Sequence, residues 1–257
     1  MAKNKDSISY IFTVAFAVCL VCAIIVATAA VSLRPVQVAN KERNFKSSIL
    51  AAAGLNEEGK TVEEQFKQVE TRLVNLETGK FSDEFDVETF DPVKATTDPA
   101  LSEKLPASED IASIKRRENY TEVYIVRDTS GDLQTIVLPI RGYGLWSTLW
   151  GFIALEGDLN TVVGLGFYSH SETPGLGGEV DNPKWKGQWL GKKINDDSGD
   201  LAIVVTKGGK ADTSSPYQVD GLSGASLTTK GVNNLVHFWM GKNGFRPFLD
   251  NLKAGDA

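Results

Sequence analysis

Cysteine and histidine are scarce in this chain of 257 residues. Its two cysteines, Cys19 and Cys22, both lie inside one long apolar run, and its two histidines are far apart, at positions 170 and 237. This scarcity excludes disulfides, iron–sulfur clusters and cysteine- or histidine-rich metal sites in the polar part of the chain. The Cys-x-x-Cys spacing is found in redox pairs, but no histidine or carboxylate lies near it. We therefore interpret both cysteines as small hydrophobic residues that contact lipid or another helix, and we expect no metal site.

Basic residues are outnumbered by acidic ones. Lysine and arginine total 27 against 33 aspartates and glutamates, which gives a net charge of −6. This balance, together with the lack of a basic stripe with interleaved aromatics, argues against a nucleic acid partner. The sequence also lacks a P-loop and a strand-borne Gly-x-Gly-x-x-Gly turn, so a nucleotide phosphate is not bound in either of those ways.

Charge is entirely missing from one segment near the N-terminus. Residues 7–33 hold no charged side chain over 27 positions. As an α-helix they would extend for roughly 40 Å, enough to cross a hydrocarbon core of about 30 Å with some tilt. A secretory signal peptide is the alternative, because Lys3 and Lys5 precede the run and small residues lie near its end. Since the apolar part of a signal peptide is only about 7–15 residues long, we favour a retained single-pass transmembrane helix.

The charges beside this helix do not settle its orientation. Two lysines precede it, and several basic residues follow it: Arg34, Lys41, Arg43 and Lys46. A literal count of positive charge would keep the C-terminal side in the cytoplasm. Large domains are translocated largely regardless of such charges, so the count by itself does not decide the topology.

The chain after this run divides into a helical connector, an irregular segment and a domain. Residues 34–53 are typical of a polar helix that leaves the membrane, and the spacing of apolar residues at 62–79 predicts a second, amphipathic helix. Those apolar residues are Val62, Phe66, Val69 and Leu73. Residues 82–106 are rich in Asp, Glu, Pro, Thr and Ser, so we expect an irregular connection on the domain surface. The expected parts are residues 1–33, with the transmembrane helix, the helical connector 34–80, the irregular wrap 81–119 and the domain 120–257.

From Tyr120 onward the apolar pattern changes to a period of two. Alternating segments on either side of a polar turn at 128–132 predict a β-hairpin, and further apolar runs predict more strands. The expected strands are 120–126, 133–138, 149–155, 161–168 and 201–205. Short turns between consecutive strands favour an antiparallel sheet. We therefore expect an α+β fold, an antiparallel sheet with flanking helices, preceded by one N-terminal transmembrane helix.

The segment Asp-Gly-Leu-Ser-Gly-Ala-Ser-Leu-Thr, which ends at Thr228, says most about chemistry. It is small, polar and interrupted by glycine. The apolar residues after it recur at the spacing of one helix face: Val232, Leu235, Val236 and Trp239. Thr228 is therefore expected at or just before a helix N-terminus, where free N–H groups and the helix dipole favour a phosphate. The structural alternative is that Thr228 is only an N-cap and Gly224 only a loop glycine.

The order of residues in this segment resembles the flavinylation motif of FMN-binding domains. Residue 226 is serine where the family more often has threonine, which keeps a hydroxyl at that position. The residues that match the motif are Asp220, Ser223, Gly224, Ala225 and Ser226, with Thr228 in the acceptor position. In that family a flavin transferase cleaves FAD and leaves FMN joined through its phosphate to the threonine. The resemblance thus implies a covalent FMN, a phosphoester on Thr228, with Asp220 contacting magnesium or the transferase during transfer.

A second segment makes the resemblance more specific within the FMN-binding domains. Residues 169–179, Ser-His-Ser-Glu-Thr-Pro-Gly-Leu-Gly-Gly-Glu, are similar to the segment that lines the flavin in this family, and the turn at 142–147 is similar to the one before it. Together with chain length and the single apolar run, they resemble the family of C subunits of bacterial sodium-translocating NADH:quinone oxidoreductases. The related G subunit of Rnf electron-transport complexes is the alternative. The cofactor-binding residues that the resemblance implies are Trp146, Glu172, Thr173, Gly175, Leu176, Gly177, Lys207, Ser223, Gly224 and Ala225.

Several of these residues also have structural interpretations. Trp146 could belong to the ordinary core, since tryptophan is commonly buried. The turn at 172–175 could be a plain surface turn, because Pro-Gly is a turn dipeptide in any context. Lys207 follows an expected strand, where a lysine is usually solvated.

The resemblance implies a membrane-anchored electron carrier. Its covalent FMN would relay electrons one at a time between redox centres of a complex that oxidises NADH, reduces ubiquinone and moves sodium. Enzyme activity would belong to that assembly, because the sequence shows no supported Ser-His-Asp or Cys-His grouping. The implied partners are the other subunits, a flavin transferase and membrane lipid, and the implied location is the bacterial inner membrane with the large domain in the periplasm. A non-redox anchored scaffold or sensor is the alternative from a different class.

Overall fold

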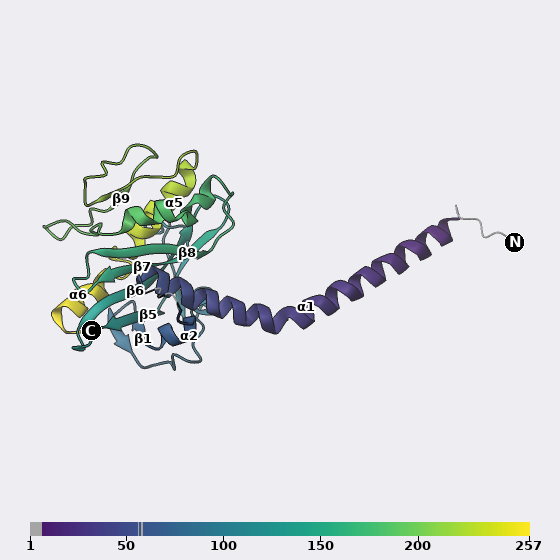
Figure 1. Ribbon diagram of the computed structural model, residues 1–257, viewed down its shortest axis with the longest axis horizontal. Coiled ribbons are helices and arrows are strands. Elements are labelled where there is room, and N and C mark those ends of the chain that lie inside the picture. Colours follow the sequence, from purple (N-terminus) through teal and green to yellow (C-terminus); the bar gives the residue numbers. More distant parts are fainter. Residues whose placement is uncertain (1–6, 56, 58) are drawn as a thin grey trace. The chain divides into compact units, whose positions relative to one another are not determined.

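The computed structural model of the protein describes residues 7–55, 57 and 59–257 and divides the chain into two units (Figure 1). The first unit ends at Asn44, and the second extends from Phe45 to Ala257. One helix, α1 (Ile8–Ala52), begins in the first unit and ends in the second. The basic start considered above, Lys3 and Lys5, lies outside the described residues.

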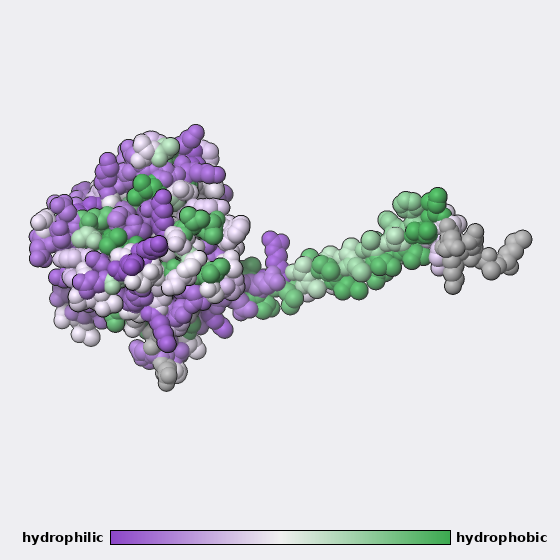
Figure 2. Space-filling view, turned by 90° about the horizontal axis from the view of Figure 1, so that it is seen from above, coloured by the Kyte–Doolittle hydropathy of each residue, from purple (hydrophilic) through white to green (hydrophobic). Residues whose placement is uncertain are grey.

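Helix α1 is the one helix in the described part of the chain that is long and apolar enough to cross a membrane, judged by length and composition. Hydrophobic residues follow one another along it (Figure 2). A helix that is apolar all round requires an apolar environment, and a bilayer supplies one. The expected apolar helix is confirmed, and the polar helix expected at 34–53 proves to be its continuation.

The second unit contains strands and short helices in mixed order. Its strands are β1 (Val69–Asn75), β2 (Lys80–Ser82), β3 (Ser102–Lys104), β4 (Arg116–Glu118), β5 (Tyr120–Arg127), β6 (Leu133–Tyr143), β7 (Thr148–Glu156), β8 (Val162–Ser169), β9 (Val204–Val205) and β10 (Gln218–Val219). Its α-helices after α1 are α2 (Val62–Phe66), α3 (Pro92–Ala95), α4 (Pro183–Lys186), α5 (Ser226–Trp239) and α6 (Arg246–Ala254). Two 3₁₀ helices, η1 (Gly177–Asp181) and η2 (Gly187–Trp189), flank α4.

Six strands form one antiparallel sheet in the order β2–β1–β5–β6–β7–β8 (Figure 1). The pairing of β6 with β7 runs from Thr135 opposite Glu156 to Tyr143 opposite Thr148. The short turn that joins these two strands therefore lies at one end of the sheet, where β6 ends and β7 begins. The α+β prediction is confirmed, because antiparallel strands joined by turns form the sheet and helices pack beside it.

Apolar residues cover both faces of this sheet. On β6, Ile136 and Leu138 belong to the main core, which also contains the buried side of α5, whereas Val137 between them joins a second core. This alternation is the period of two that a strand imposes. The second core also contains Ile49 and Ala52 from the end of α1. Because burying such a side chain contributes about 1.5–3 kcal/mol, both cores hold the sheet in place.

The amphipathic helix expected at 62–79 is wrong beyond its first turn. Helix α2 begins at Val62 as expected, with a capping box between Thr61 and Glu64, but it ends at Phe66 and β1 follows. Strand β1 pairs with β5 along its whole length and lies between β5 and β2. Its adjacent residues Leu73 and Val74 are both fully buried, one on each face. A strand that is covered on both faces loses the alternation by which strands are recognised, so its apolar spacing imitated a helix.

Two further expectations need adjustment. The hairpin of β5 and β6 forms as expected, but β6 continues to Tyr143. Within the strand expected at 201–205, only Val204–Val205 forms one, and it pairs in parallel with β10. Residues 82–106 are largely irregular as expected, with α3 and β3 inside them. These departures do not affect the sheet that carries the candidate site.

Candidate functional site

Three segments that are distant in sequence meet at the end of the sheet where β6 and β8 end. The first is the turn between β6 and β7, and the second is the segment after β8. The third is the loop that leads into α5 together with the first turns of that helix. One buried carboxylate, Glu172, joins all three. Its Oε1 accepts hydrogen bonds from the backbone N–H groups of Leu145 and Trp146, both at 3.0 Å, and its Oε2 accepts one from the Thr228 hydroxyl at 2.6 Å.

The Glu172 carboxylate is ionised by virtue of these donors. Burial by itself raises the pKa of a carboxyl group, and only 5% of this residue is exposed. The hydrogen bonds from Thr228, Trp146, Leu145 and Ser147 outweigh burial, so that the pKa of Glu172 lies below its usual value. The negative charge therefore stays next to the Thr228 hydroxyl at neutral pH.

Glycines allow the three segments to approach this closely. An ideal Cβ atom on Gly177 would lie 2.5 Å from Thr228 Oγ1, and one on Gly144 would lie 2.6 Å from Glu172 Oε1. On α5, a Cβ atom at Gly231 would lie 2.5 Å from the carbonyl oxygen of Tyr143. Real Cβ atoms essentially never come so near, and glycine is the residue that allows close backbone approach. Each segment thus contributes one glycine to the junction.

Thr228 lies in the first turn of α5, and 1% of it is exposed. The helix begins at Ser226 and its N-cap is Ala225, so the interpretation of Thr228 as an N-cap is wrong. The hydroxyl instead donates to Glu172. Because α5 begins at Ser226, Thr228 lies among the first residues of the helix, whose backbone N–H groups have no acceptor within the helix.

The neighbouring threonine has a different environment. Thr229 is also buried, but its hydroxyl oxygen accepts a hydrogen bond from the backbone N–H of Leu222 at 2.9 Å. This bond closes the loop that leads into α5. The two adjacent hydroxyls therefore differ in partner: Thr229 holds the loop, whereas Thr228 is paired with a carboxylate.

The turn after Glu172 combines a fixed backbone with an exposed apolar tip. The Thr173 carbonyl accepts hydrogen bonds from the N–H groups of Leu176 and Gly178, and Gly175 has a φ of 76°, which favours glycine. Leu176, at the tip, is 45% exposed, and its side chain packs against Gly224 in the loop before α5. The turn is thus held against the motif loop, although it lies some fifty residues earlier.

Trp146 does not belong to the core, since 64% of it is exposed. Its backbone N–H binds Glu172, so the position of the residue is fixed while its ring faces solvent. Other exposed apolar residues lie on the same three segments, and sequence reasoning did not select them: Tyr143, Leu145 and Leu227. The available signal was the aromatic, glycine-rich turn Gly142–Trp146 and a glycine, Gly231, inside an otherwise regular helix pattern.

Two expected site residues contact other parts of the chain in the structure. The Asp220 carboxylate accepts hydrogen bonds from the backbone N–H groups of Gly209, Lys210 and Ala211, which fixes that loop. Burial raises the pKa of this carboxyl group, but these hydrogen bonds outweigh it and leave the pKa below its usual value. Lys207 is exposed and lines a hollow with Ser226 and Lys230, on the Thr229 side of α5.

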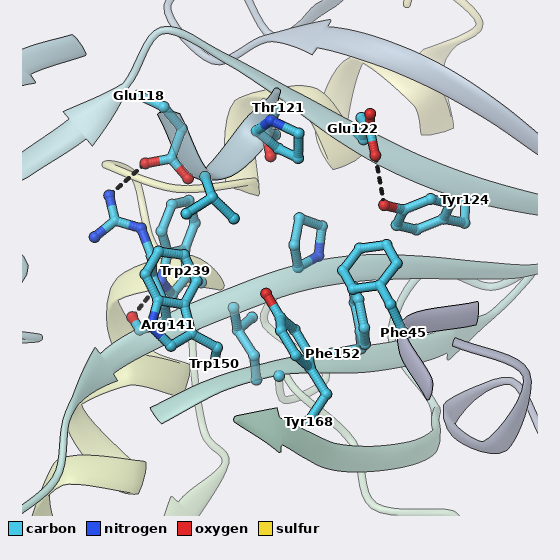
Figure 3. Close-up of a pocket in the computed structure, with 15 residues that line it drawn as sticks. Phe45, Glu118, Thr121, Glu122, Tyr124, Arg141, Trp150, Phe152, Tyr168 and Trp239 are labelled. Carbon is cyan, nitrogen blue, oxygen red and sulfur yellow. Dashed lines mark hydrogen bonds and ion pairs between the residues drawn. The ribbon is translucent and has the colours of Figure 1, made fainter. Parts of the chain in front are cut away.

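A second polar cluster lines a hollow elsewhere in the domain (Figure 3). Arg141 and Glu118 form a buried ion pair, and the guanidinium lies 5.4 Å from the ring centre of Trp150. Nearby, the Tyr124 hydroxyl donates to Glu122 at 2.6 Å. None of the expected cofactor-binding residues lines this hollow.

Comparison with known proteins gives the class first. Residues 144–241 match the FMN-binding domain family model. The match contains the turn before β7, the Glu172 turn, the motif loop and all of α5. The chain therefore contains an FMN-binding domain, and the matched residues include Glu172 and Thr228.

Full-length relatives give the particular family. The C subunit of the Na(+)-translocating NADH-quinone reductase of Pseudomonas aeruginosa is 56% identical over 99% of both chains, and that of Vibrio anguillarum is 48% identical over 99% of both. The crystal structure of Shewanella oneidensis NqrC has a TM-score of 0.77 at 39% identity and covers 84% of this chain and 99% of that chain. The crystal structure of the same subunit from Parabacteroides distasonis has a TM-score of 0.65 at 30% identity, with coverages of 84% and 96%.

The chain therefore belongs to the NqrC family, the C subunits of Na(+)-translocating NADH-quinone reductases. The expected resemblance is confirmed in favour of this family over the Rnf G subunit. As a member, the chain is a subunit of the quinone reductase complex and carries an FMN-binding domain with a long apolar N-terminal helix.

Proposed function

We propose that this chain carries FMN as a phosphoester on Thr228 and relays electrons one at a time between redox centres of the quinone reductase complex. The observation that carries the proposal is the placement of Thr228 in the first turn of α5, where its hydroxyl is hydrogen-bonded to Glu172. Exposed apolar residues lie on the segments that meet there. The residue order from Asp220 to Thr228 supplies the motif, and the structure brings the Glu172 turn to it.

The residues at the junction fit the chemistry of FMN. The free N–H groups and positive dipole end of α5 would stabilise the phosphodiester charge. The exposed side chains of Trp146, Leu176 and Leu227 offer apolar surface for the flavin ring. Backbone groups of Thr173, Gly175 and Gly177 would hydrogen-bond its polar edge, and the loop 223–225 would border the phosphate.

FMN supplies the redox chemistry, because a flavin can exchange single electrons. The chain itself would supply attachment, orientation and electrostatics. Attachment at Thr228 removes dissociation as a way of losing the cofactor. The Glu172 carboxylate and the backbone N–H groups bound to it keep the turn, the motif loop and the β6–β7 connection in one arrangement.

The partners and the membrane location that we propose rest on family membership and on helix α1. The other subunits of the complex would donate and accept the electrons, and a flavin transferase would load the cofactor. Helix α1 would anchor the chain in lipid as a single pass of the bacterial inner membrane, with the large domain in the periplasm. Asp220 and Ser226 are assigned to recognition during flavinylation, although Asp220 also holds its own loop. A non-redox scaffold remains the alternative if no flavin attaches.

The test is production of the full chain together with its flavin transferase. We expect a yellow protein whose flavin stays attached after denaturation, with an intact mass that includes one FMN and with the flavin on the peptide that holds Thr228. The Thr228→Ala variant should remain folded and colourless. A colourless wild-type protein would support the scaffold alternative, and flavin mapped to Thr229 or Ser226 would move the attachment site.

A further inference from the structure

Flavin attachment at Thr228 requires a proton acceptor. A threonine hydroxyl is a weak nucleophile at neutral pH and becomes effective only when an adjacent base takes its proton. A transferase could bring that base with it, or the acceptor chain could hold one already. The contacts of Thr228 distinguish these two arrangements.

The base is already in place in this chain. Thr228 Oγ1 lies 2.6 Å from Glu172 Oε2, within the distance at which a general base acts on the proton it removes. The other carboxylate oxygen, Oε1, is occupied by the N–H groups of Leu145 and Trp146. The two oxygens therefore have separate tasks: one fixes the side chain to the β6–β7 turn, and the other faces the hydroxyl.

We propose that Glu172 is the general base for covalent flavin attachment to Thr228 of its own chain. The inference rests on the proposed function. In the reaction, Thr228 Oγ1 forms a bond to the FMN-side phosphorus of FAD, and the bond from that phosphorus to the bridging oxygen of the pyrophosphate breaks. The hydroxyl proton passes to Glu172 Oε2, and AMP leaves with the bridging oxygen. No oxidant or reductant is involved.

Other titratable groups near Glu172 are engaged elsewhere. The His170 ring accepts a hydrogen bond from the Glu172 N–H through Nδ1 and pairs with Asp181 through Nε2 at 2.9 Å. The carboxylate of Glu179 accepts from the side-chain amide of Asn182. Among the residues that the structure describes, Glu172 is the carboxylate hydrogen-bonded to the Thr228 hydroxyl.

The geometry also requires a movement before transfer. The Thr228 hydroxyl is covered, because Gly177 lies directly against it and only 1% of the residue is exposed. The turn from Thr173 to Gly178 must therefore shift to admit a phosphate. Glu172 is bound to Leu145 and Trp146 on a different segment, so it can remain beside Thr228 while the turn opens.

The test measures the steady-state rate of flavin incorporation into the full chain by a flavin transferase with FAD, read as covalent flavin by intact mass. Glu172→Gln keeps the shape and can still accept the two backbone N–H bonds. We expect its kcat to fall by about 10²–10⁴-fold, the usual contribution of a general base, with little change in KM for the acceptor chain. Glu179→Gln, the same chemical change on the same segment, is the matched control and should react like the wild type.

Glu172→Asp provides a second measurement that does not depend on the amide variant folding. It keeps the charge but withdraws the carboxylate by one methylene group, and a displacement of about 1 Å can cost up to about 10²-fold. We expect kcat to fall at least about tenfold at unchanged KM, since the carboxylate no longer reaches the hydroxyl. Wild-type kcat in either folded variant overturns the proposal and assigns the base to the transferase. If the wild-type chain itself takes up no flavin at Thr228, the proposed function fails instead, which is a separate outcome.

Discussion

Gly177 lies so close to Thr228 that a Cβ atom at position 177 would be 2.5 Å from the threonine hydroxyl oxygen. The same Cβ atom would be 2.6 Å from Glu172 Oε2. The turn after β8 and the first turn of α5 are therefore in direct contact, and the residue that permits this contact has no side chain. Flavin attachment is expected to depend on that fit.

Gly177→Ala tests this contact. The methyl group must push the turn away from α5 or break the bond between Glu172 and Thr228, so we expect slower flavin incorporation and a lower free energy of unfolding, by about 1–3 kcal/mol for an overpacked site. The measurements are covalent flavin per chain by intact mass and unfolding in denaturant. Gly187→Ala is the control, because a Cβ atom at Gly187 meets nothing within 4 Å and its backbone is already helical. Equal effects of the two substitutions would contradict the close fit.

Substitutions at the two adjacent threonines should have different effects: one on the stability of the fold and the other on flavin attachment. Thr229→Val leaves the buried Leu222 N–H without its acceptor, so we expect a loss of about 1–3 kcal/mol in the free energy of unfolding with flavin still on Thr228. Thr228→Val should abolish covalent flavin, and Thr228→Ser should retain it because the hydroxyl remains. Peptide mapping together with unfolding in denaturant gives both results. Flavin lost from the Thr229 variant and retained by the Thr228 variant would reverse the assignment.

Leu176→Asp should change the flavin without preventing its attachment. Leu176 is an exposed apolar residue at the tip of a turn that packs against the motif loop. A carboxylate placed against the bound ring would alter its electrostatics, so we expect a shifted absorption spectrum or a lower reduction potential. Leu190→Asp is a matched control, since Leu190 is 67% exposed and lies outside the junction. An unchanged spectrum and an unchanged redox titration in the folded Leu176 variant would remove this turn from the flavin site.

Acid should remove the contribution of Asp220 to stability. The N–H groups of Gly209, Lys210 and Ala211 hold the pKa of this carboxyl below its usual value, against the opposing effect of burial. A lowered folded-state pKa means that the contribution is present above the unfolded pKa, about 3.9, and is lost as the pH falls through the folded value. The difference in unfolding free energy between wild type and Asp220→Asn, measured in detergent, should therefore be constant near pH 6–7 and shrink below about pH 4. A difference that is independent of pH would contradict this assignment.

Topology is open to a direct test. If α1 spans the inner membrane with the domain in the periplasm, protease added to intact spheroplasts should digest the domain and leave the apolar segment in the membrane fraction. A cytoplasmic protein serves as the control for intact cells. Protection of the domain in intact spheroplasts, lost on lysis, would reverse the orientation and show that the basic residues after the span dominate.

Much of the fold could be predicted because its signals are local. The uncharged run at 7–33, the period-two pattern of β5 to β8 and the helical spacing after Thr228 each depend on near neighbours in sequence, and each forms the expected element. Strand β1 did not follow this rule, since it forms by pairing with β5, which lies much later in the chain. The two-residue strand β9 likewise depends on its distant partner β10.

The sequence by itself determined the family, the acceptor candidate and the apolar helix, because motif order, composition and spacing are properties of the chain. The tertiary structure decided which side chains are hydrogen-bonded to which. Only folding places Glu172 against Thr228, which follows it by 56 residues. Folding also fixes the backbone of the exposed Trp146 and pairs the Thr229 hydroxyl with the backbone of Leu222. The structure also shows that Asp220, a motif residue, accepts a hydrogen bond from the backbone of the 209–211 loop. The physical reason is that hydrogen bonds and burial join segments through space, and a linear pattern contains no record of which carboxylate meets which hydroxyl.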